Sequence, residues 1–291
     1  MDNLIIYVNG EYLKERDAKI SVFDRGFLYG DGFFEGIRIY NGKIFKCDEH
    51  MDRFYDSSKY TMIPIKNSKQ EIIDVMNKLI ELNNIKDGYI RLVMSRGNYN
   101  NLGVTPPDDE ILKPTLVCIA SNITIYDKKF YEEGINVVIS SFVRMNPSMG
   151  DPQCKSLNYL TNILAKAEAK NQNAQEAIFL NTNGVVTECT ADNIFIIKDN
   201  KVYTPPTHTG ILNGITRILV IELLKDLGYE IYEKEFTRFN LYTCDECFLT
   251  GTGAEVIGVA SIDDRKIGDG KVGKHTKIII ERFRKYIEEN C

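Results

Sequence analysis

The chain has 291 residues, 43% of them hydrophobic and 26% charged, and its formal net charge at pH 7 is −5. These values are ordinary for a globular protein, and they exclude a disordered chain, a collagen-like fibre and a membrane bundle. A mildly acidic chain also lacks the basic surface of nucleic-acid-binding proteins, so we expect neither nucleic acid nor a membrane among its partners.

The cysteines indicate a reducing compartment. There are seven, an odd number in a chain of this size, which argues against a disulfide framework and favours the cytoplasm. We also expect no signal peptide at the N-terminus. Cys244 and Cys247 form a single CxxC, and the sequence has no second CxxC or histidine pair to complete a zinc site. We therefore interpret this pair as the entry to a strand and expect no metal.

The first third of the sequence predicts strands joined by hairpins, followed by helices. Asn9-Gly10 and Asn41-Gly42 are two-residue hairpin turns between apolar runs. Ser68 and Glu71 have the spacing of a capping box. Residues 96–110, rich in Gly, Asn and Pro, predict a long functional loop. The remaining apolar spacing predicts helices over 48–60 and 68–84 and strands over 89–95 and 114–121.

The rest of the chain predicts a second region of mixed structure. Polar residues over 122–134 indicate a linker, so we expect a smaller N-terminal α+β domain over 1–121 and a larger C-terminal α+β domain over 135–291. In the larger domain the pattern predicts strands over 135–143, 176–180, 185–190, 193–198, 229–236, 247–250 and 255–260, and helices over 156–171, 215–227 and 274–288.

Three side chains are candidates for chemistry. Lys155 precedes Ser156, the predicted N-cap of the helix over 156–171, and Tyr159 would share a helix face with it. A lysine beside a tyrosine can act as a Schiff-base nucleophile, and the alternative is an ordinary lysine of the first helical turn. Arg53 either holds a phosphate or carboxylate or lies on a solvated helix face.

Glu188 and two loops add to this set. Alternation places Glu188 on one strand face with Val186, so its carboxylate needs a partner, which is either a salt bridge or a protonated ring nitrogen. Small residues in the segments 212–217 and 250–254 suit an anion bound by backbone amides. The loop over 250–254 is not a Walker motif, and Gly30-Asp31-Gly32 lacks the context of a dinucleotide fingerprint. A lysine, a carboxylate, a tyrosine, an arginine and two phosphate-type loops are what pyridoxal phosphate requires.

Eight segments also occur in a characteristic order and spacing: VFDRGFLYGDGFFEGIRIYNGKIF, EHMDRFYDSSK, YIRLVMSRG, KSLNYLTNILAKAEA, EAIFLNTNGVVTE, DNIFIIKDNKVYTPP, ILNGITR and LTGTGAEV. Through them nearly the whole chain resembles the class IV (fold type IV) aminotransferases, and within these the branched-chain amino-acid aminotransferases. The resemblance implies two α+β domains with pyridoxal 5'-phosphate between them and a homo-oligomer that is at least a dimer.

The resemblance also implies a role for each matching residue. Lys155 would be the catalytic residue and carry the cofactor as a Schiff base, Tyr159 would hydrogen-bond the cofactor's phenolic oxygen, and Glu188 its pyridine nitrogen. Val104, on the long loop, is expected to reach the site of the neighbouring subunit. The other implied roles are phosphate binding by Arg53, Ile215, Thr216 and Thr252, and substrate binding by Tyr29, Phe34, Tyr89, Arg91, Val104, Gly253 and Ala254.

The implied activity transfers the amino group of L-Leu, L-Ile or L-Val to 2-oxoglutarate. The nearest alternative is D-amino-acid aminotransferase, which usually carries Arg and His in the long loop, where this chain has GNYNNLGVTPPDD. Aminodeoxychorismate lyase and a non-catalytic binding protein of the same fold are further alternatives. One departure from the family is Cys189, which stands where glycine usually follows the glutamate, and we expect its side chain in the core.

Overall fold

The computed structural model describes residues 4–99, 102–108, 111–123 and 126–291. The chain divides into two compact units. The first unit comprises the residues up to Ile123 together with Cys154–Asn158 and Cys291, and the second comprises Thr124–Gln153 and Tyr159–Asn290. The domain boundaries expected from the sequence, near 121 and 135, remain predictions. Within the described ranges, no helix has the length and apolar character needed to cross a bilayer.

The first unit is built on a six-stranded antiparallel sheet with the strand order β2-β1-β6-β5-β3-β4. Both predicted hairpins are confirmed, since Asn9 and Gly10 have φ of 49° and 103°, and Asn41 and Gly42 have φ of 50° and 77°. Positive φ at both central positions is what the twist of a two-residue hairpin demands. The strands are β1 (Ile5–Val8), β2 (Glu11–Lys14), β3 (Gly32–Tyr40), β4 (Lys43–Ile44), β5 (Gly88–Ser95) and β6 (Thr115–Ser121).

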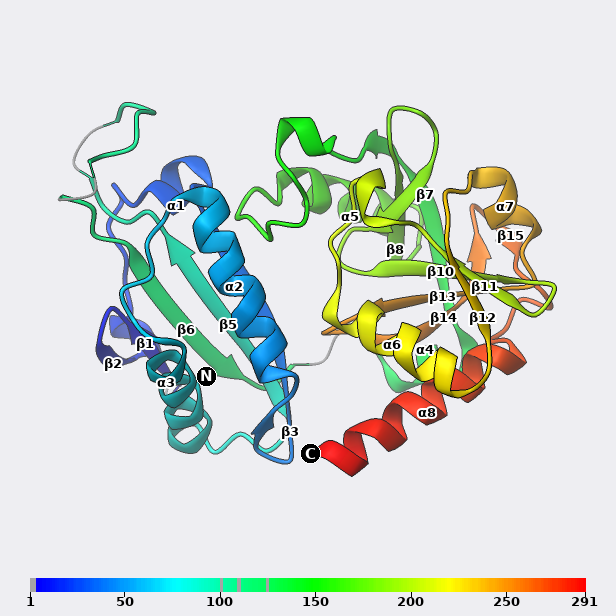
Figure 1. Ribbon diagram of the computed structural model, residues 1–291, viewed down its shortest axis with the longest axis horizontal. Helices are drawn as coiled ribbons and strands as arrows, with labels where there is room; N and C mark the ends of the chain where they lie inside the picture. The colour runs from blue at the N-terminus through cyan, green and yellow to red at the C-terminus, as the bar shows by residue number, and fades with distance from the viewer. Residues whose placement is uncertain (1–3, 100–101, 109–110, 124–125) are drawn as a thin grey trace. The chain divides into compact units, whose positions relative to one another are not determined.

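Two amphipathic helices, α2 (Cys47–Thr61) and α3 (Lys69–Leu82), cover one face of this sheet (Figure 1). Both confirm the helices expected from the apolar spacing. The capping box is also confirmed, because the Ser68 side chain accepts from the Glu71 amide while the Glu71 carboxylate accepts from the Ser68 amide. Between helices and sheet the core includes an edge-to-face pair, Phe33 and Phe54, with ring centroids 4.9 Å apart.

A short helix, α1 (Arg25–Tyr29), was not expected, because five residues carry too little periodicity to identify a helix. Local capping holds it instead. The Asp24 carboxylate accepts from the Gly26 amide at 2.8 Å, and Gly30 ends the helix in the left-handed conformation with φ of 67°. This helix brings Arg25 and Tyr29 to the start of β3.

The second unit contains a nine-stranded sheet with the order β12-β11-β10-β13-β14-β7-β8-β9, in which β15 pairs with β14. It mixes antiparallel hairpins with parallel pairs between β7, β8 and β14, so the prediction of mixed α+β structure is confirmed. The strands are β7 (Ile135–Val143), β8 (Glu176–Leu180), β9 (Val186–Cys189), β10 (Asn193–Lys198), β11 (Lys201–Thr204), β12 (Glu230–Glu233), β13 (Glu246–Gly251), β14 (Glu255–Ile262) and β15 (Arg265–Lys266).

The helices of this unit pack on both faces of the sheet (Figure 1). The two helices expected near 215–227 and 274–288 are confirmed, whereas two helices of six residues each were not expected. The helices are α4 (Lys128–Glu133), α5 (Leu160–Asn171), α6 (Ile215–Asp226), α7 (Arg238–Thr243) and α8 (Lys274–Asn290), and short 3-10 turns lie at Pro147–Met149 and Thr207–Thr209. A further 3-10 turn, Glu15–Asp17, lies in the first unit.

The helix expected to start at Ser156 begins only at Leu160. Residues 155–157 are instead bound to the free edge of β3, because the Phe34 amide donates to the Lys155 carbonyl at 2.9 Å and the Leu157 amide donates to Gly32 at 3.0 Å. The predicted cap at Ser156, and the helix face shared by Lys155 and Tyr159, are therefore wrong. The physical reason is that β4 pairs only with the last residues of β3, which leaves backbone groups at its start in need of partners.

Three cysteines lie in the apolar core of the second unit. Cys244 follows α7 and Cys247 lies in β13, so the interpretation of the CxxC as a strand entry is confirmed. Cys189 is also buried there, as expected. Burial raises the pKa of the Cys189 thiol well above its ordinary value, and nearby carboxylates add to the effect. These thiols are therefore packing groups rather than nucleophiles.

Candidate active site

One face of the first sheet, opposite to α2 and α3, brings together four residues predicted from the sequence. The antiparallel register pairs Gly36 with Arg91, and the bridge between Phe33 and Ser156 places Lys155 on the same face as Phe34. The Lys155 Nζ lies 4.9 Å from the centroid of the Phe34 ring, and the Arg91 Cζ lies 4.3 Å from it. An amine and a guanidinium thus flank one aromatic ring.

Tyr89 completes this face because Gly36 leaves room for it. A Cβ built on Gly36 would lie 1.7 Å from the Tyr89 hydroxyl oxygen, so any side chain there would displace the tyrosine. The Arg91 Cζ lies 5.6 Å from the Tyr89 ring centroid. The face therefore offers a cation and a phenol that can bind a carboxylate, next to the amine of Lys155.

Arg53 lies on the other side of β3, and it is not on a solvated helix face. Its Nε and Nη2 donate to the two oxygens of Glu35 at 2.7 and 2.8 Å, and His50 Nδ1 lies 2.8 Å from Glu35 Oε2. Burial alone would raise the pKa of Glu35, but the Arg53 charge and these hydrogen bonds outweigh it and hold that pKa well below its usual range. Since Glu35 is ionised, His50 Nδ1 is the donor.

Burial lowers the pKa of His50, which is therefore neutral near pH 7.

The bidentate ion pair between Arg53 and Glu35 fixes the plane of the Arg53 guanidinium, so that Nη1 points away from Glu35. Sequence analysis missed Glu35 and His50. The available signals were a carboxylate among the apolar residues of β3 and the spacing of His50 and Arg53 on one helix face.

In the second unit, Glu188 is held by three donors. Arg144 Nη2 lies 2.5 Å from Glu188 Oε1, and Oε2 accepts from Asn193 Nδ2 at 3.1 Å and from the Leu212 amide at 3.0 Å. A salt bridge, one of the two partners considered, is therefore present. Arg144 was missed from the sequence, where it is a lone basic residue after an apolar strand.

The start of α6 lies close to this carboxylate. Its N-cap is Gly214, and within the described ranges no side chain caps the first turn, where Ile215 and Thr216 lie. A Cβ on Gly214 would lie 2.1 Å from the Asn193 side-chain oxygen, so only glycine fits. The amides of Ile215 and Thr216 are thus placed to bind an anion next to Glu188.

A second indication of a ligand is the hydroxyl of Thr250. It is buried, and the described part of the chain offers it no hydrogen-bond partner. In the register of β10 and β13, Thr250 pairs directly with Asn193, which holds Glu188. A buried hydroxyl without a partner is rare in a native protein and is consistent with a ligand that supplies one. The turn that follows carries Thr252, Gly253 and Ala254.

Each unit carries groups that suit a part of pyridoxal phosphate. In the first unit the Lys155 amine suits its aldehyde. In the second unit the Glu188 carboxylate suits its protonated ring nitrogen, and uncapped amides suit its phosphate. Of the other predicted residues, Tyr159 precedes α5 as its N-cap, and Ala254 is buried with its carbonyl accepting from Tyr131 at 3.1 Å. The predicted loop over 96–110 includes 100–101 and 109–110, which lie outside the described residues.

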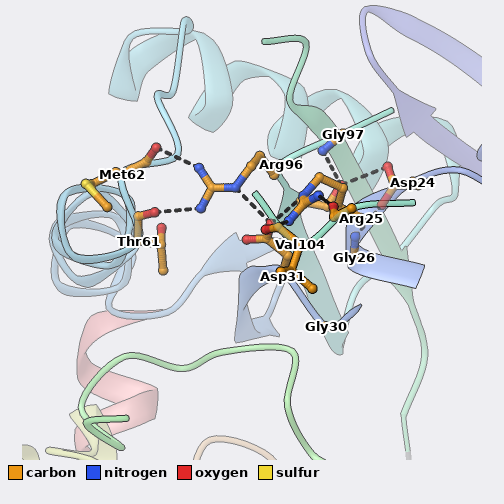
Figure 2. Close-up of polar contacts among 12 residues, drawn as sticks. Asp24, Arg25, Gly26, Gly30, Asp31, Thr61, Met62, Arg96, Gly97 and Val104 are labelled. Atoms are coloured by element: carbon orange, nitrogen blue, oxygen red, sulfur yellow. Dashed lines mark hydrogen bonds and ion pairs between the residues drawn. The ribbon is translucent and has the colours of Figure 1, made fainter. Parts of the chain in front are cut away.

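Two residues of α1, Tyr29 and Arg25, contact the described part of this loop, and Figure 2 shows Arg25 beside Val104. The Tyr29 hydroxyl donates to the Leu102 carbonyl, and Arg25 donates to the carbonyl of Val104. A phenol has a single O–H, so Tyr29 would have to exchange this partner to donate to a substrate carboxylate. Its role toward substrate stays a prediction.

A family model described as amino-transferase class IV matches residues 32–262. A Methanocaldococcus jannaschii protein, assigned provisionally by its name to the branched-chain-amino-acid aminotransferases, is 46% identical over 96% of this chain and 95% of its own. A D-alanine aminotransferase from Staphylococcus haemolyticus is 38% identical over 97% of this chain and 98% of its own.

The solved structures agree with the fold described above. The branched-chain amino acid aminotransferase of Escherichia coli superposes with a TM-score of 0.93 at 35% identity, over 97% of this chain and 93% of that one. The branched-chain amino acid aminotransferase of Thermobaculum terrenum, solved in its PLP-form, gives a TM-score of 0.89 at 27% identity, over 100% of this chain and 96% of that one.

Proposed function

Because the chain belongs to the class IV aminotransferases, we propose that it transfers the amino group of L-Leu, L-Ile and L-Val to 2-oxoglutarate, with pyridoxal 5'-phosphate as its cofactor. The observation that carries the proposal is the Phe34 ring, with the Arg91 Cζ at 4.3 Å and the Lys155 Nζ at 4.9 Å. A branched amino acid needs an apolar surface for its side chain, a cation for its carboxylate and an amine base near Cα, and this face offers all three.

When bound, pyridoxal phosphate supplies an electron-withdrawing ring that stabilises negative charge developing at the substrate Cα. In this proposal Lys155 Nζ holds the cofactor and then removes the Cα proton. Glu188, which is ion-paired with Arg144, holds a proton at the ring nitrogen. Tyr159 hydrogen-bonds the phenolic oxygen.

The phosphate in this proposal is bound by Arg53, by the amides of Ile215 and Thr216, and by Thr252. Arg53 suits the task because Glu35 fixes its guanidinium in one orientation. For the acceptor 2-oxoglutarate, Arg91 and Tyr89 bind the distal carboxylate through charge-assisted hydrogen bonds.

The alternative substrate class is D-amino acids, since D-alanine aminotransferases are among the relatives. What favours L-branched-chain substrates is the loop sequence Leu102–Asp108, LGVTPPD, which carries neither Arg nor His. A loop without Arg or His offers no additional cation to bind the substrate carboxylate. Leu102 and Val104 offer apolar surface instead.

A substrate panel tests the proposal. We expect kcat/KM for L-Leu, L-Ile and L-Val with 2-oxoglutarate to exceed that for D-Ala by at least about 100-fold, because several methylenes meet an apolar surface. The measurement is formation of glutamate by purified holoenzyme, with its L and D forms separated by chiral chromatography, because transfer from D-Ala by a D-specific enzyme would give D-glutamate. Activity on D-Ala in the absence of activity on L-Leu would overturn the substrate assignment.

We also propose that the protein is at least a homodimer. In the single chain, α5 exposes Leu160, Ile163 and Leu164 by 69%, 61% and 41%, although the three lie on one face at helical spacing. An apolar helix face of this kind is typical of an interface between subunits.

Changing both Leu160 and Ile163 to lysine is therefore expected to weaken the dimer at least about 100-fold, because two charges would be buried in an apolar interface. Sedimentation velocity over a concentration series measures this effect. Glu222→Lys on α6 introduces the same residue at an exposed position without removing apolar surface, and it should leave the dimer intact. An unchanged dimer in the double variant would contradict the assignment of α5 to the interface.

A further inference from the structure

A single carboxylate in the first unit binds two buried arginines. Asp31 Oδ2 accepts from Arg25 Nε at 2.8 Å and from Arg96 Nε at 2.8 Å (Figure 2). The two arginine side chains are only 4% and 9% exposed. Although burial opposes it, the hydrogen bonds from Arg96 and Arg25 lower the pKa of Asp31, so the carboxylate is ionised near pH 7. None of these three residues has a part in the function proposed above.

Arg25 uses the rest of its guanidinium to hold the loop after β5. Its Nη1 donates to the Gly103 carbonyl at 2.9 Å and its Nη2 donates to the Val104 carbonyl at 2.8 Å. The guanidinium is planar, so binding of Nε by Asp31 fixes the direction of both Nη groups. The carboxylate therefore determines where two successive carbonyls of the loop are held.

Helix α1 adds a third contact to the same loop. The Tyr29 hydroxyl donates to the Leu102 carbonyl, and the Arg25 Cζ lies 5.0 Å from the Tyr29 ring centroid. Three successive carbonyls, at 102, 103 and 104, are thus bound from one helix. The side chains of Leu102 and Val104 remain 66% and 77% exposed, so this loop presents apolar groups on a backbone that is held in place.

Arg96 also donates to two successive carbonyls, but those of a different segment. Its Nη1 donates to the Met62 carbonyl at 3.0 Å and its Nη2 donates to the Thr61 carbonyl at 2.8 Å, at the end of α2 (Figure 2). Arg25 and Arg96 therefore share one carboxylate oxygen, similar burial and the same pattern of two carbonyl acceptors. They differ in which segment they hold, which makes each a control for the other.

We infer that Arg25, oriented by Asp31, is a positioning residue for substrate specificity: it sets the place of the Val104 side chain and through it the discrimination between amino-acid side chains. The inference rests on the proposed function, in which Val104 offers apolar surface to the substrate side chain. An apolar pocket discriminates between side chains through close contact. A shift of the loop by about 1 Å would therefore remove most of this discrimination. Arg25 touches neither cofactor nor substrate in this account.

The test compares Arg25→Met with Arg96→Met in the holoenzyme. In Arg25→Met, we expect the ratio of kcat/KM for L-Leu to that for L-Ala to fall about 10-fold, since a lost methylene contact is worth that much. The change should lie in KM for L-Leu. The dissociation constant for pyridoxal phosphate, measured by titration of the apoenzyme, should change by less than about threefold. Arg96→Met should lower the unfolding temperature but keep the Leu/Ala ratio within about twofold.

Arg25→Lys is the second variant, in case the methionine variant does not fold. It keeps a charge beside Asp31, but an ammonium cannot hold two carbonyls and a carboxylate in one plane, so the Leu/Ala ratio should still fall. Val104→Ala should lower the ratio by itself. Adding Arg25→Met to Val104→Ala should lower it little further, because both act through one side chain.

Each failure has a distinct signature. If the wild-type enzyme does not transaminate L-Leu, the proposed function fails. If Val104→Ala lowers the ratio while Arg25→Met and Arg25→Lys keep it, or if Arg96→Met lowers it equally, the positioning role of Arg25 is overturned. If Val104→Ala leaves the ratio unchanged, the inference is overturned as well, while transamination of L-Leu stands.

Discussion

Lys155→Ala is expected to abolish covalent binding of pyridoxal phosphate and to lower kcat by at least about 10²–10⁴-fold, the contribution of a positioned acid–base group. The covalent link is measured by borohydride reduction followed by mass spectrometry, and kcat by transfer of the amino group from L-Leu. The wild-type holoenzyme should be coloured and become trapped on reduction, whereas the variant should release its cofactor on dialysis.

The structure predicts that this variant folds normally. Lys155 is held through its backbone, because its carbonyl accepts from the Phe34 amide, and that bond does not depend on the side chain. Lys155→Arg is the matched variant, since it keeps a cation near the Phe34 ring but has no amine of suitable basicity. A reduced adduct that persists in both variants would identify another lysine as the nucleophile.

How far the sequence predicts this structure depends on the range of the interactions involved. The hairpins at Asn9-Gly10 and Asn41-Gly42 and the capping box at Ser68 were predicted correctly, since each depends on residues within four positions of one another. The long helices were also predicted, because a repeating apolar face needs no knowledge of its partner. Helix α1 was missed because capping, rather than a repeat, holds it.

Lys155 was identified as the candidate nucleophile, but its local structure was predicted wrongly. The pattern after Ser156 is helical, yet the segment pairs with β3, more than 100 positions earlier in the chain. An unpaired strand edge is a property of the folded sheet, and no local pattern around Ser156 reveals it.

The partners of the candidate site residues are likewise non-local. Arg53 read alone suggested a solvated helix face, and its partner Glu35 lies on a strand that precedes it by 18 positions. Glu188 was correctly expected to need a partner, yet Arg144, 44 positions away, could not be identified from alternation along one strand. Family resemblance supplied the candidate roles, and geometry supplies the groups that hold these residues.

The other large effect is expected for Glu188→Gln. Arg144, Asn193 and the Leu212 amide all donate to the carboxylate, and a glutamine amide has one oxygen to accept them. In either amide orientation a donor faces a donor, and the charge of Arg144 loses its partner. Breaking a pair buried to this degree costs about 3–5 kcal/mol of unfolding free energy. Loss of the charge that holds the ring-nitrogen proton should also lower kcat on the order of 10²–10³-fold.

Glu176→Gln separates the two effects. Glu176 is fully buried and is held by Lys166, Thr190 and the Ala177 amide, so its loss should destabilise the second unit by a comparable amount. It has no part in the proposed site. With saturating pyridoxal phosphate and at a temperature where both variants are folded by circular dichroism, Glu188→Gln should be nearly inactive and Glu176→Gln nearly unchanged. Equal kcat values would mean that Glu188 stabilises the fold without acting on the cofactor ring.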